Sequence, residues 1–370
     1  MKILVAGDFC PRNRVEQYIE VGDYSTIFGK VKEFIVQSDY AIVNFECPVV
    51  KGQAQPIEKL GPNLKCTGRS VEALKYAGFN CVTLANNHFL DYGPEGVKDT
   101  LTTLDAQGIE HVGGGMDLSN SSKILYHDIK GEKLAIINCC EHEFSIATEN
   151  TAGSNPLNPI KQYASIQEAR KKANRVIVIV HGGHEHFQLP SPRMVETYRF
   201  FIDVGADAVV NHHQHCYSGY EVYNGKPIFY GLGNFCFDNP EQHSGKWTEG
   251  YFVTIDFEDC IKYEIHPYRQ CAEEVGVIPL AKQAFNDKLY ELNSTIADDK
   301  KLQSEIDEYY GKTSGACSWL FEPIRTGLYY VLRYKGWLPS FVSRKRKLSA
   351  VNLILCEAYC DRMKWWLQHK

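Results

Sequence analysis

Three of the thirteen histidines lie within four positions, at His212, His213 and His215, directly after an apolar run at 208–210. Neutral imidazole is the commonest protein ligand of transition metals. Side chains on alternate residues, such as those of His213 and His215, can converge on one ion. We therefore expect a metal site at this point of the chain, and we expect His212 to pack or to bond to backbone.

Other residues of ligand type also follow apolar runs, and they add carboxylate and amide oxygens to the imidazole nitrogens. This donor mixture suits Mn, Zn or Fe, and a carboxylate such as that of Glu46 can bridge two ions. Two ions held close together can activate a water and hold the oxygens of a phosphate ester. Each such residue alone more often makes structural hydrogen bonds, but the joint pattern favours one shared site. The expected ligands of one or two divalent ions are Asp8, Glu46, Asn87, His181, His213 and His215.

The segment ANNHFLDYG at 85–93 is a candidate acid loop. His88 stands beside the expected ligand Asn87 and could protonate a leaving group. Asp91, three residues further on, could orient that imidazole. The sequence thus predicts His88 and Asp91 as catalytic residues.

Short, wholly apolar runs are typical of strands that are covered on both faces. Helical patterns lie between several of them and end in glycine, as helix C-caps do. Alternation of strand and helix predicts an α/β domain that extends to about residue 270, and sites in open α/β sheets form at the carboxyl ends of strands. The expected strands are 2–6, 40–45, 81–85, 134–138, 176–180, 208–210 and 227–231, and the expected helices are 70–78, 95–108 and 192–205.

The end of the chain differs from the rest. Longer polar helical stretches follow residue 280, and 344–370 has apolar residues at the spacing of one amphipathic helix. Residues 323–370 carry a charge of about +8, whereas the whole chain carries −5. We consider three interpretations of this basic end: packing on the acidic main domain, which we favour, binding to a membrane surface, and nucleic-acid binding, which the overall negative charge disfavours.

Composition is that of an ordinary globular protein, with 44% hydrophobic and 23% charged residues. The thirteen cysteines are scattered without a disulfide-framework spacing, which fits reduced thiols. The first residues lack the features of a secretory signal, and no apolar stretch reaches the length that spans a bilayer. We expect a cytoplasmic protein, with peripheral attachment to the inner face of the membrane as an alternative.

Several segments together resemble the bacterial capsule synthesis CapA family, also called poly-gamma-glutamate synthesis proteins. These are AGDFCPRNR, VNFECPV, LANNHFLDYG, HGGHEH and, above all, the long stretch VGADAVVNHHQHCYSGYEVYNGKPIFYGLGNFCFD. The resemblance covers about residues 1–260 and places the chain in the calcineurin-like metallophosphoesterase superfamily. It implies a four-layer αββα sandwich, which we expect over 1–270. The change in residue pattern predicts a mostly helical C-terminal region over 271–370 with a basic amphipathic end.

The resemblance also assigns roles to single residues. Asp8 matches the first metal-binding Asp, Glu46 takes the place of a bridging Asp, and Asn87 with His88 matches an Asn-His pair. His181 matches the isolated histidine, and His213 with His215 the terminal His-x-His. The departures are Cys10 in place of a second histidine, Gly182 for Trp, Asn211 for Gly and Gln214 for Pro. Cys10 is either a thiolate ligand or, as we favour, a small buried residue.

Further residues are expected around the ligands. Substrate contacts are expected from Arg12, Arg14, His184 and Glu185, because guanidinium groups clamp anions and the latter two belong to the matched motif. The ligands are expected to be supported by hydrogen bonds from Asn44, Asn86 and Asn234.

These residues and the resemblance predict metal-dependent hydrolysis or transfer on a phosphoester or an amide, in the biosynthesis of a capsule or another cell-surface polymer. The expected partner is an anionic polymer or its phosphorylated precursor. The basic C-terminal helix could add a membrane or synthesis-complex partner, and no nucleic acid is expected. Two alternatives are a non-catalytic scaffold subunit and a metal-independent enzyme that uses His88 and Asp91 as acid and base.

Overall fold

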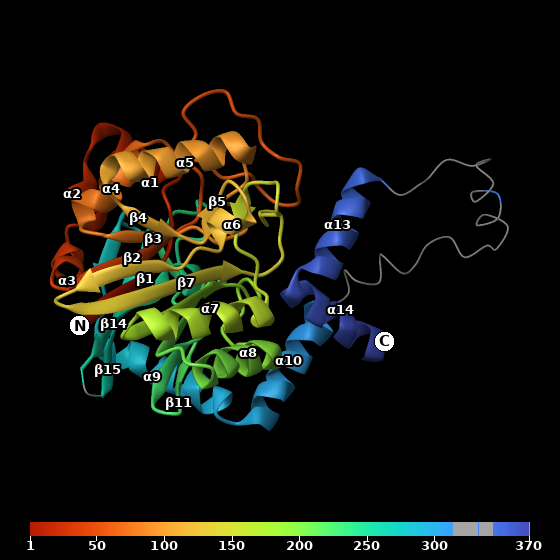
Figure 1. Cartoon of the computed structure of the whole chain (residues 1–370). Coiled ribbons are helices and arrows are strands. Elements are labelled where there is room, and N and C mark those ends of the chain that lie inside the picture. The colour runs from red at the N-terminus through yellow and green to blue at the C-terminus, as the bar shows by residue number, and fades with distance from the viewer. Residues whose placement is uncertain (259, 314–331, 333–342, 370) are drawn as a thin grey trace.

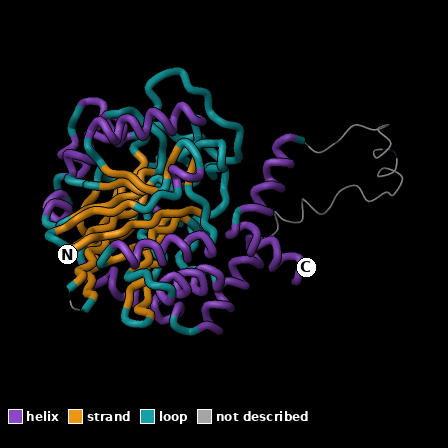
Figure 2. Tube along the Cα trace, viewed as in Figure 1, coloured by secondary structure: helices purple, strands orange, loops and turns teal. Residues whose placement is uncertain are grey.

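The computed structural model describes residues 1–258, 260–313, 332 and 343–369. Two β-sheets face one another, and helices cover their outer surfaces (Figure 1). In Figure 2 the strands form the middle of the molecule between two groups of helices. This is the four-layer αββα arrangement that the sequence predicts.

The first sheet has the order β16-β15-β14-β1-β2-β3-β4, and β13 also pairs with β1. Strands β1 to β4 run parallel, whereas β14, β15 and β16 form antiparallel pairs. Its strands are β1 (Lys2–Cys10), β2 (Tyr40–Phe45), β3 (Cys81–Thr83), β4 (Glu110–Val112), β13 (Asn234–Phe237), β14 (Glu249–Phe257), β15 (Ile261–Gln270) and β16 (Val277–Pro279).

The second sheet has the order β11-β12-β10-β9-β7-β6, with parallel pairing from β12 to β7 and antiparallel strands at both edges. Its strands are β6 (Leu125–Ile129), β7 (Glu132–Cys140), β9 (Arg175–His181), β10 (Ala208–His212), β11 (Tyr220–Tyr223) and β12 (Lys226–Phe229). A small pair, β5 (Gly114–Gly115) and β8 (Gly153–Ser154), lies apart from both sheets.

Successive side chains of each strand point to opposite faces of the sheet. One apolar run therefore contributes to two hydrophobic cores. In β1, Ile3 and Val5 point into the core between the sheets, whereas Leu4 and Ala6 point into the core under the helices. Strands covered on both faces need apolar residues at every position, which explains the unbroken apolar runs. All the strands expected from such runs are present.

Helices cover the outer faces of both sheets. On the first sheet lie α1 (Arg14–Val21), α2 (Tyr24–Phe28), α3 (Lys32–Val36), α4 (Arg69–Ala77) and α5 (Gly93–Gln107). The second sheet is covered by α7 (Pro159–Lys172) and α8 (Pro192–Asp203), together with α10 (Asp299–Thr313). The remaining elements of the main body are α6 (Leu118–Ser121), the 3-10 turn η1 (Gly245–Trp247) and α9 (Lys282–Ile296).

Glycine caps end two of the three expected helices. Gly78 after α4 and Gly108 after α5 have left-handed backbone, as the sequence predicts. Helix α8 differs, because Val204 caps it and Gly205 follows. The expected domain boundary at residue 270 falls between β15 and β16, which pair with each other.

The basic end forms two helices, α13 (Arg344–Leu355) and α14 (Glu357–His369), where we expected one. The break falls at Cys356, whose ψ of 124° is extended rather than helical. We call α13 and α14 together the tail. Trp337 and most of the basic segment before residue 343 lie outside the described residues. Within the described part of the chain, no helix is long and apolar enough to cross a membrane.

The tail packs on the main domain, as the favoured interpretation expects. The first turn of α14 donates the Ala358 N–H to buried Glu141, which follows β7 (3.1 Å). Arg193 of α8 joins the two parts, because it binds both Glu141 (2.6 Å) and Asp361 of α14 (2.7 Å). A further bond runs from the Trp365 indole to Asp307 of α10 (2.8 Å).

One contact of the tail predicts a pH dependence. The hydrogen bond from His142 Nδ1 to Glu357 (2.6 Å) raises the pKa of His142 above its ordinary 6.5. A raised pKa in the folded protein adds stability that is complete below pH 6.5 and is lost as pH rises through the raised value. We expect backbone amides of α14 to exchange hydrogen faster at pH 8.5 than at pH 6, after correction for intrinsic rates. The His142→Gln variant should lose this difference; an unchanged difference in that variant would contradict the assignment.

Candidate metal centre

Carboxyl ends of strands from both sheets meet at one point of the molecule. Asp8 lies near the end of β1, Glu46 directly follows β2, and His181 is the last residue of β9. The loop with His213 and His215 follows β10. Parallel pairing places Asp8 beside Asn44 in one sheet and His181 beside His212 in the other.

Asp8, Glu46 and His181 form the centre of this site. Each offers one ligand atom, and these atoms all lie within 4.8 Å of one another. His215 lies on the same side, with Nε2 3.5 Å from Glu46 Oε1 and Nδ1 3.8 Å from Asp8 Oδ2. An ion among these atoms would meet two carboxylates and two imidazoles.

The remaining expected ligands touch this centre through His181. The His181 Nε2 atom lies 3.0 Å from His213 Nδ1 and 3.1 Å from Asn87 Oδ1. The backbone N–H of His213 also donates to Asp8 (3.2 Å). The six residues that the sequence predicts as ligands therefore form one connected group.

Glu46 shows that these residues fit a cation. Its side chain is fully buried, and neither of its carboxylate oxygens accepts a hydrogen bond from a donor among the described residues. A buried carboxylate is costly unless a cation or hydrogen-bond donors compensate it. Burial and the neighbouring Asp8 raise the pKa of Glu46 well above its usual range. Oxygen donors mixed with imidazole nitrogens suit Mn, Zn or Fe.

Two of the buried histidines have lowered pKa values, which favours the neutral form that binds metal. Burial lowers the pKa of His181 well below its usual value, and neighbouring histidines add to this effect. Burial also lowers the pKa of His215. A metal ligand must carry a free nitrogen lone pair, so a lowered pKa keeps these rings ready to bind.

Three asparagines form hydrogen bonds with the expected ligands or with one another. Asn44 donates to Asp8 (2.7 Å), and Asn86 donates to the side-chain oxygen of Asn44 (3.3 Å). Asn234 Oδ1 lies 2.9 Å from His215 Nδ1, which fixes the ring and leaves Nε2 toward Glu46. Such partners orient a metal-binding imidazole and select its tautomer.

The backbone of the histidine loop is strained. His213 has a φ of 90° and His215 a φ of 55°, both in the left-handed region that favours glycine. Strained backbone persists only where surrounding contacts enforce it, and it concentrates at functional sites. Here the strain turns alternate imidazoles toward one centre.

The candidate acid loop brings His88 into contact with Asp91, and Lys59 joins the pair. His88 Nδ1 lies 2.7 Å from Asp91, and Lys59 forms an ion pair with Asp91 and approaches the same nitrogen (3.0 Å). Burial and the positive charge of Lys59 outweigh Asp91 and lower the pKa of His88 to about 4. The ring is therefore neutral near pH 7, and Asp91 favours the tautomer in which Nε2 accepts a proton. Lys59 lies in a long loop without a motif and is not predicted from the sequence.

Other predicted residues have structural contacts instead. His212 Nε2 bonds to the Ala6 carbonyl (3.0 Å), as one sequence interpretation expects. Cys10 is buried in the apolar core under the helices, in agreement with the favoured interpretation. Asn211 donates to Gly182, so two of the departures from the family pattern contact each other.

The expected substrate residues divide into two groups. Arg14 binds Asp238 through several bonds (2.7 Å for the shortest) and donates to nearby carbonyls. His184 bonds to Tyr310 of α10 (2.9 Å) and so attaches that helix to the main domain. Glu185 lines a cavity beside the metal centre. Arg12, Arg14 and His184 do not line it.

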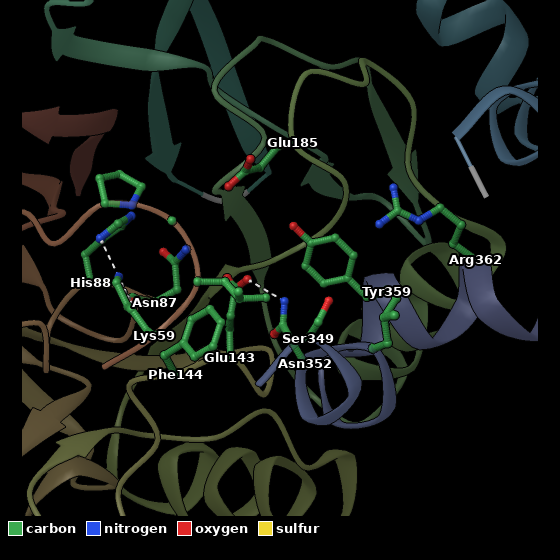
Figure 3. A pocket seen from close by; sticks show the side chains of 14 residues that line it. Lys59, Asn87, His88, Glu143, Phe144, Glu185, Ser349, Asn352, Tyr359 and Arg362 are labelled. Atoms are coloured by element: carbon green, nitrogen blue, oxygen red, sulfur yellow. Dashed lines mark hydrogen bonds between the residues drawn. The ribbon is translucent and has the colours of Figure 1, made fainter. Parts of the chain in front are cut away.

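A cavity of about 450 Å³ opens beside the centre. Figure 3 shows Glu185 pointing into it from above, with Asn87 and His88 on one side and side chains of the tail on the other. Sequence reasoning did not find most of these residues, because they come from loops and from the distant tail. The lining includes Lys59, Asn87, His88, Glu143, Phe144, Glu185, Ser349, Asn352, Leu353, Tyr359 and Arg362.

Residues 2–239 match the family model described as bacterial capsule synthesis protein PGA_cap. The chain belongs to this capsule synthesis family. Every predicted metal ligand lies inside the matched segment, whereas α9, α10 and the tail lie beyond it.

Two relatives of this chain come from Bacillus. The capsule biosynthesis protein CapA of Bacillus anthracis is 32% identical over 64% of this chain and 60% of its own length. The PGA biosynthesis protein CapA of Bacillus subtilis (strain 168) is 37% identical over 63% of this chain and 62% of its own length. The chain thus spans about three fifths of each relative. Among solved structures, a 5'-nucleotidase precursor from Thermus thermophilus aligns with a TM-score of 0.43 and 12% identity, over 80% of this chain and 58% of that one.

Proposed function

We propose that this chain is a metal-dependent hydrolase or transferase acting on a phosphoester or an amide of an anionic polymer or its precursor, in the biosynthesis of a capsule or another cell-surface polymer. The observation that carries the proposal is the pair of buried, unpartnered oxygens of Glu46 beside Asp8, His181 and His215. Family membership supports the biosynthetic setting.

The proposed holders of the ion are Asp8, Glu46, His181 and His215, with Asn87 and His213 beside them. A divalent ion in this place would supply Lewis-acid polarisation of a phosphoryl or carbonyl oxygen. The chain itself orients the donors, because asparagines fix Asp8 and His215.

His88 is the proposed proton carrier. Its position in the wall of the cavity places the imidazole next to the centre, and Asp91 fixes the ring through Nδ1. In that tautomer Nε2 accepts a proton from an attacking water or hydroxyl and returns it to the leaving group. Lys59 forms an ion pair with Asp91.

Metal content and activity together test this proposal. We expect the full chain, purified without chelators, to contain about one or two equivalents of Mn, Zn or Fe. We expect it to hydrolyse either bis(p-nitrophenyl) phosphate or a γ-glutamyl anilide, and His213→Ala to lower kcat/KM by at least about 100-fold.

The control is His111→Ala. His111 lies on β4, outside the candidate site, and it pairs with Asp105. This variant should leave metal content and activity unchanged. Folded protein that binds no metal and hydrolyses neither probe would contradict the proposal and favour the scaffold alternative.

A further inference from the structure

The tail forms one wall of the cavity at the metal centre. In Figure 3, Tyr359 and Arg362 project from the tail helices opposite Lys59, Asn87 and His88 of the main domain. Asn352 of α13 reaches across to Glu143 (3.5 Å). A substrate that enters this cavity therefore contacts both the matched family segment and a part of the chain beyond it.

The position of this wall is fixed by buried polar contacts. Glu141 is only 4% exposed, and it holds both the Ala358 N–H of α14 and the guanidinium of Arg193. Arg362 follows Ala358 by one helical turn, on the same helix. The geometry that anchors α14 therefore also determines where Arg362 lies.

Arg362 differs from the other cation in the wall. Lys59 is already paired with Asp91. Among the described residues, Arg362 has no ion pair with a carboxylate, and its buried Nε has no hydrogen-bond partner. Its guanidinium packs 4.8 Å from the centroid of the Tyr359 ring. The aromatic ring packs against the planar group and takes none of its N–H donors in a hydrogen bond.

We propose that Arg362 binds an anionic group of the substrate, a carboxylate or a phosphate, at a distance from the bond that reacts. A guanidinium presents a planar fork of donors that matches either anion with two parallel bonds. Glu143 and Glu185 also line the cavity and Lys59 is already paired, so among the described lining residues Arg362 is the cation that remains available to an anion. This inference rests on the proposed function, in which the substrate is anionic.

Titration calorimetry on the full, metal-loaded chain tests the role of Arg362, with triglutamate and inorganic phosphate as separate probes. Hydrogen bonds to charged groups correspond to about 10- to 100-fold in affinity. We expect Arg362→Gln to weaken binding of at least one probe by at least about tenfold, and the probe affected tells whether the anion is a carboxylate or a phosphate. The matched control is Lys364→Gln, which removes the same charge from an exposed position of the same helix and should bind as the wild type.

Hydrogen exchange of α14 in Arg362→Gln shows whether the tail remains docked, and Arg362→Lys shows whether charge alone suffices. The proposal is overturned if neither probe binds the wild type, if Arg362→Gln binds both probes as tightly as the wild type, or if Lys364→Gln loses as much affinity. These readouts require no turnover. Loss of the proposed catalytic function, with probe binding still dependent on Arg362, would leave the anion site in place.

Discussion

Replacing Glu46 with glutamine is expected to stabilise the metal-free protein while removing most of its affinity for metal. In the absence of a cation, the buried carboxylate has no compensating donor among the described residues. Glutamine has the same shape, carries no charge, and can donate to Asp8 or to His215 Nε2. We expect the free energy of unfolding of the metal-free protein to rise by about 1–2 kcal/mol.

The same substitution removes a ligand that faces two imidazoles. Loss of a residue that merely orients a ligand costs about 10- to 100-fold in metal affinity, so loss of the ligand itself should cost at least about 100-fold. The measurements are urea unfolding with and without Mn or Zn, and direct metal titration. We expect the difference in the free energy of unfolding between Glu46→Gln and the wild type to change sign. The variant should be more stable than the wild type without metal and less stable with saturating metal.

Asp207→Asn provides the matched control for Glu46. Asp207 is also buried, but it is paired with Arg170 (2.8 Å) and accepts the Val176 N–H (2.9 Å). Its replacement should destabilise the protein with and without metal and leave metal affinity unchanged. A Glu46→Gln variant that is less stable in both conditions would show that Glu46 has a structural role instead.

Replacing Arg193 with glutamine is expected to release the tail. Arg193 connects Glu141 of the main domain with Asp361 of α14, and its loss leaves two carboxylates close together without a cation. Breaking a buried ion pair costs about 3–5 kcal/mol. Because the Arg193 side chain is 26% exposed, we expect a smaller loss of about 2–4 kcal/mol in the free energy of unfolding. Amides of α14 should also exchange hydrogen much faster.

Arg199→Gln tests whether this effect is specific to the tail. Arg199 lies on the same helix α8 and binds Glu221 of β11 (2.7 Å), with similar exposure but no contact to the described part of the tail. Its replacement should cost less stability and leave exchange in α14 unchanged. Slow exchange of α14 in Arg193→Gln would contradict the assigned role of Arg193.

The sequence predicts those parts of the molecule that depend on local pattern. The buried strands appear as apolar runs because both faces are covered, and the ligands directly follow those runs. The pattern does not predict β15, because partly buried and exposed residues alternate over 261–265 and Pro267 follows, so the strand forms no apolar run. Strand β14 contains the mostly apolar run 251–255, but it is not among the strands expected from the sequence. The family resemblance supplied the roles of single ligands, which the pattern alone leaves open.

Contacts between distant parts of the chain could not be predicted in this way. Lys59 reaches His88 from a loop without regular structure, and Arg193 meets Asp361 across 168 residues of sequence. The break at Cys356 is marked by neither glycine nor proline. It is explained by the docking of the next helix on Glu141, which is a tertiary contact.

The pairing of β1 has a consequence for how the protein is made. Asp8 belongs to the first strand, yet that strand lies between β2 and β14, and its end also pairs with β13. While a ribosome is still synthesising residues before 234, the growing chain has only one of the three strands that pair with β1. Non-local pairing of this kind forms slowly, because distant segments must first meet. The pairing of β1 is therefore completed only after β14 has been synthesised, and the nascent chain exposes an unpaired strand edge until then.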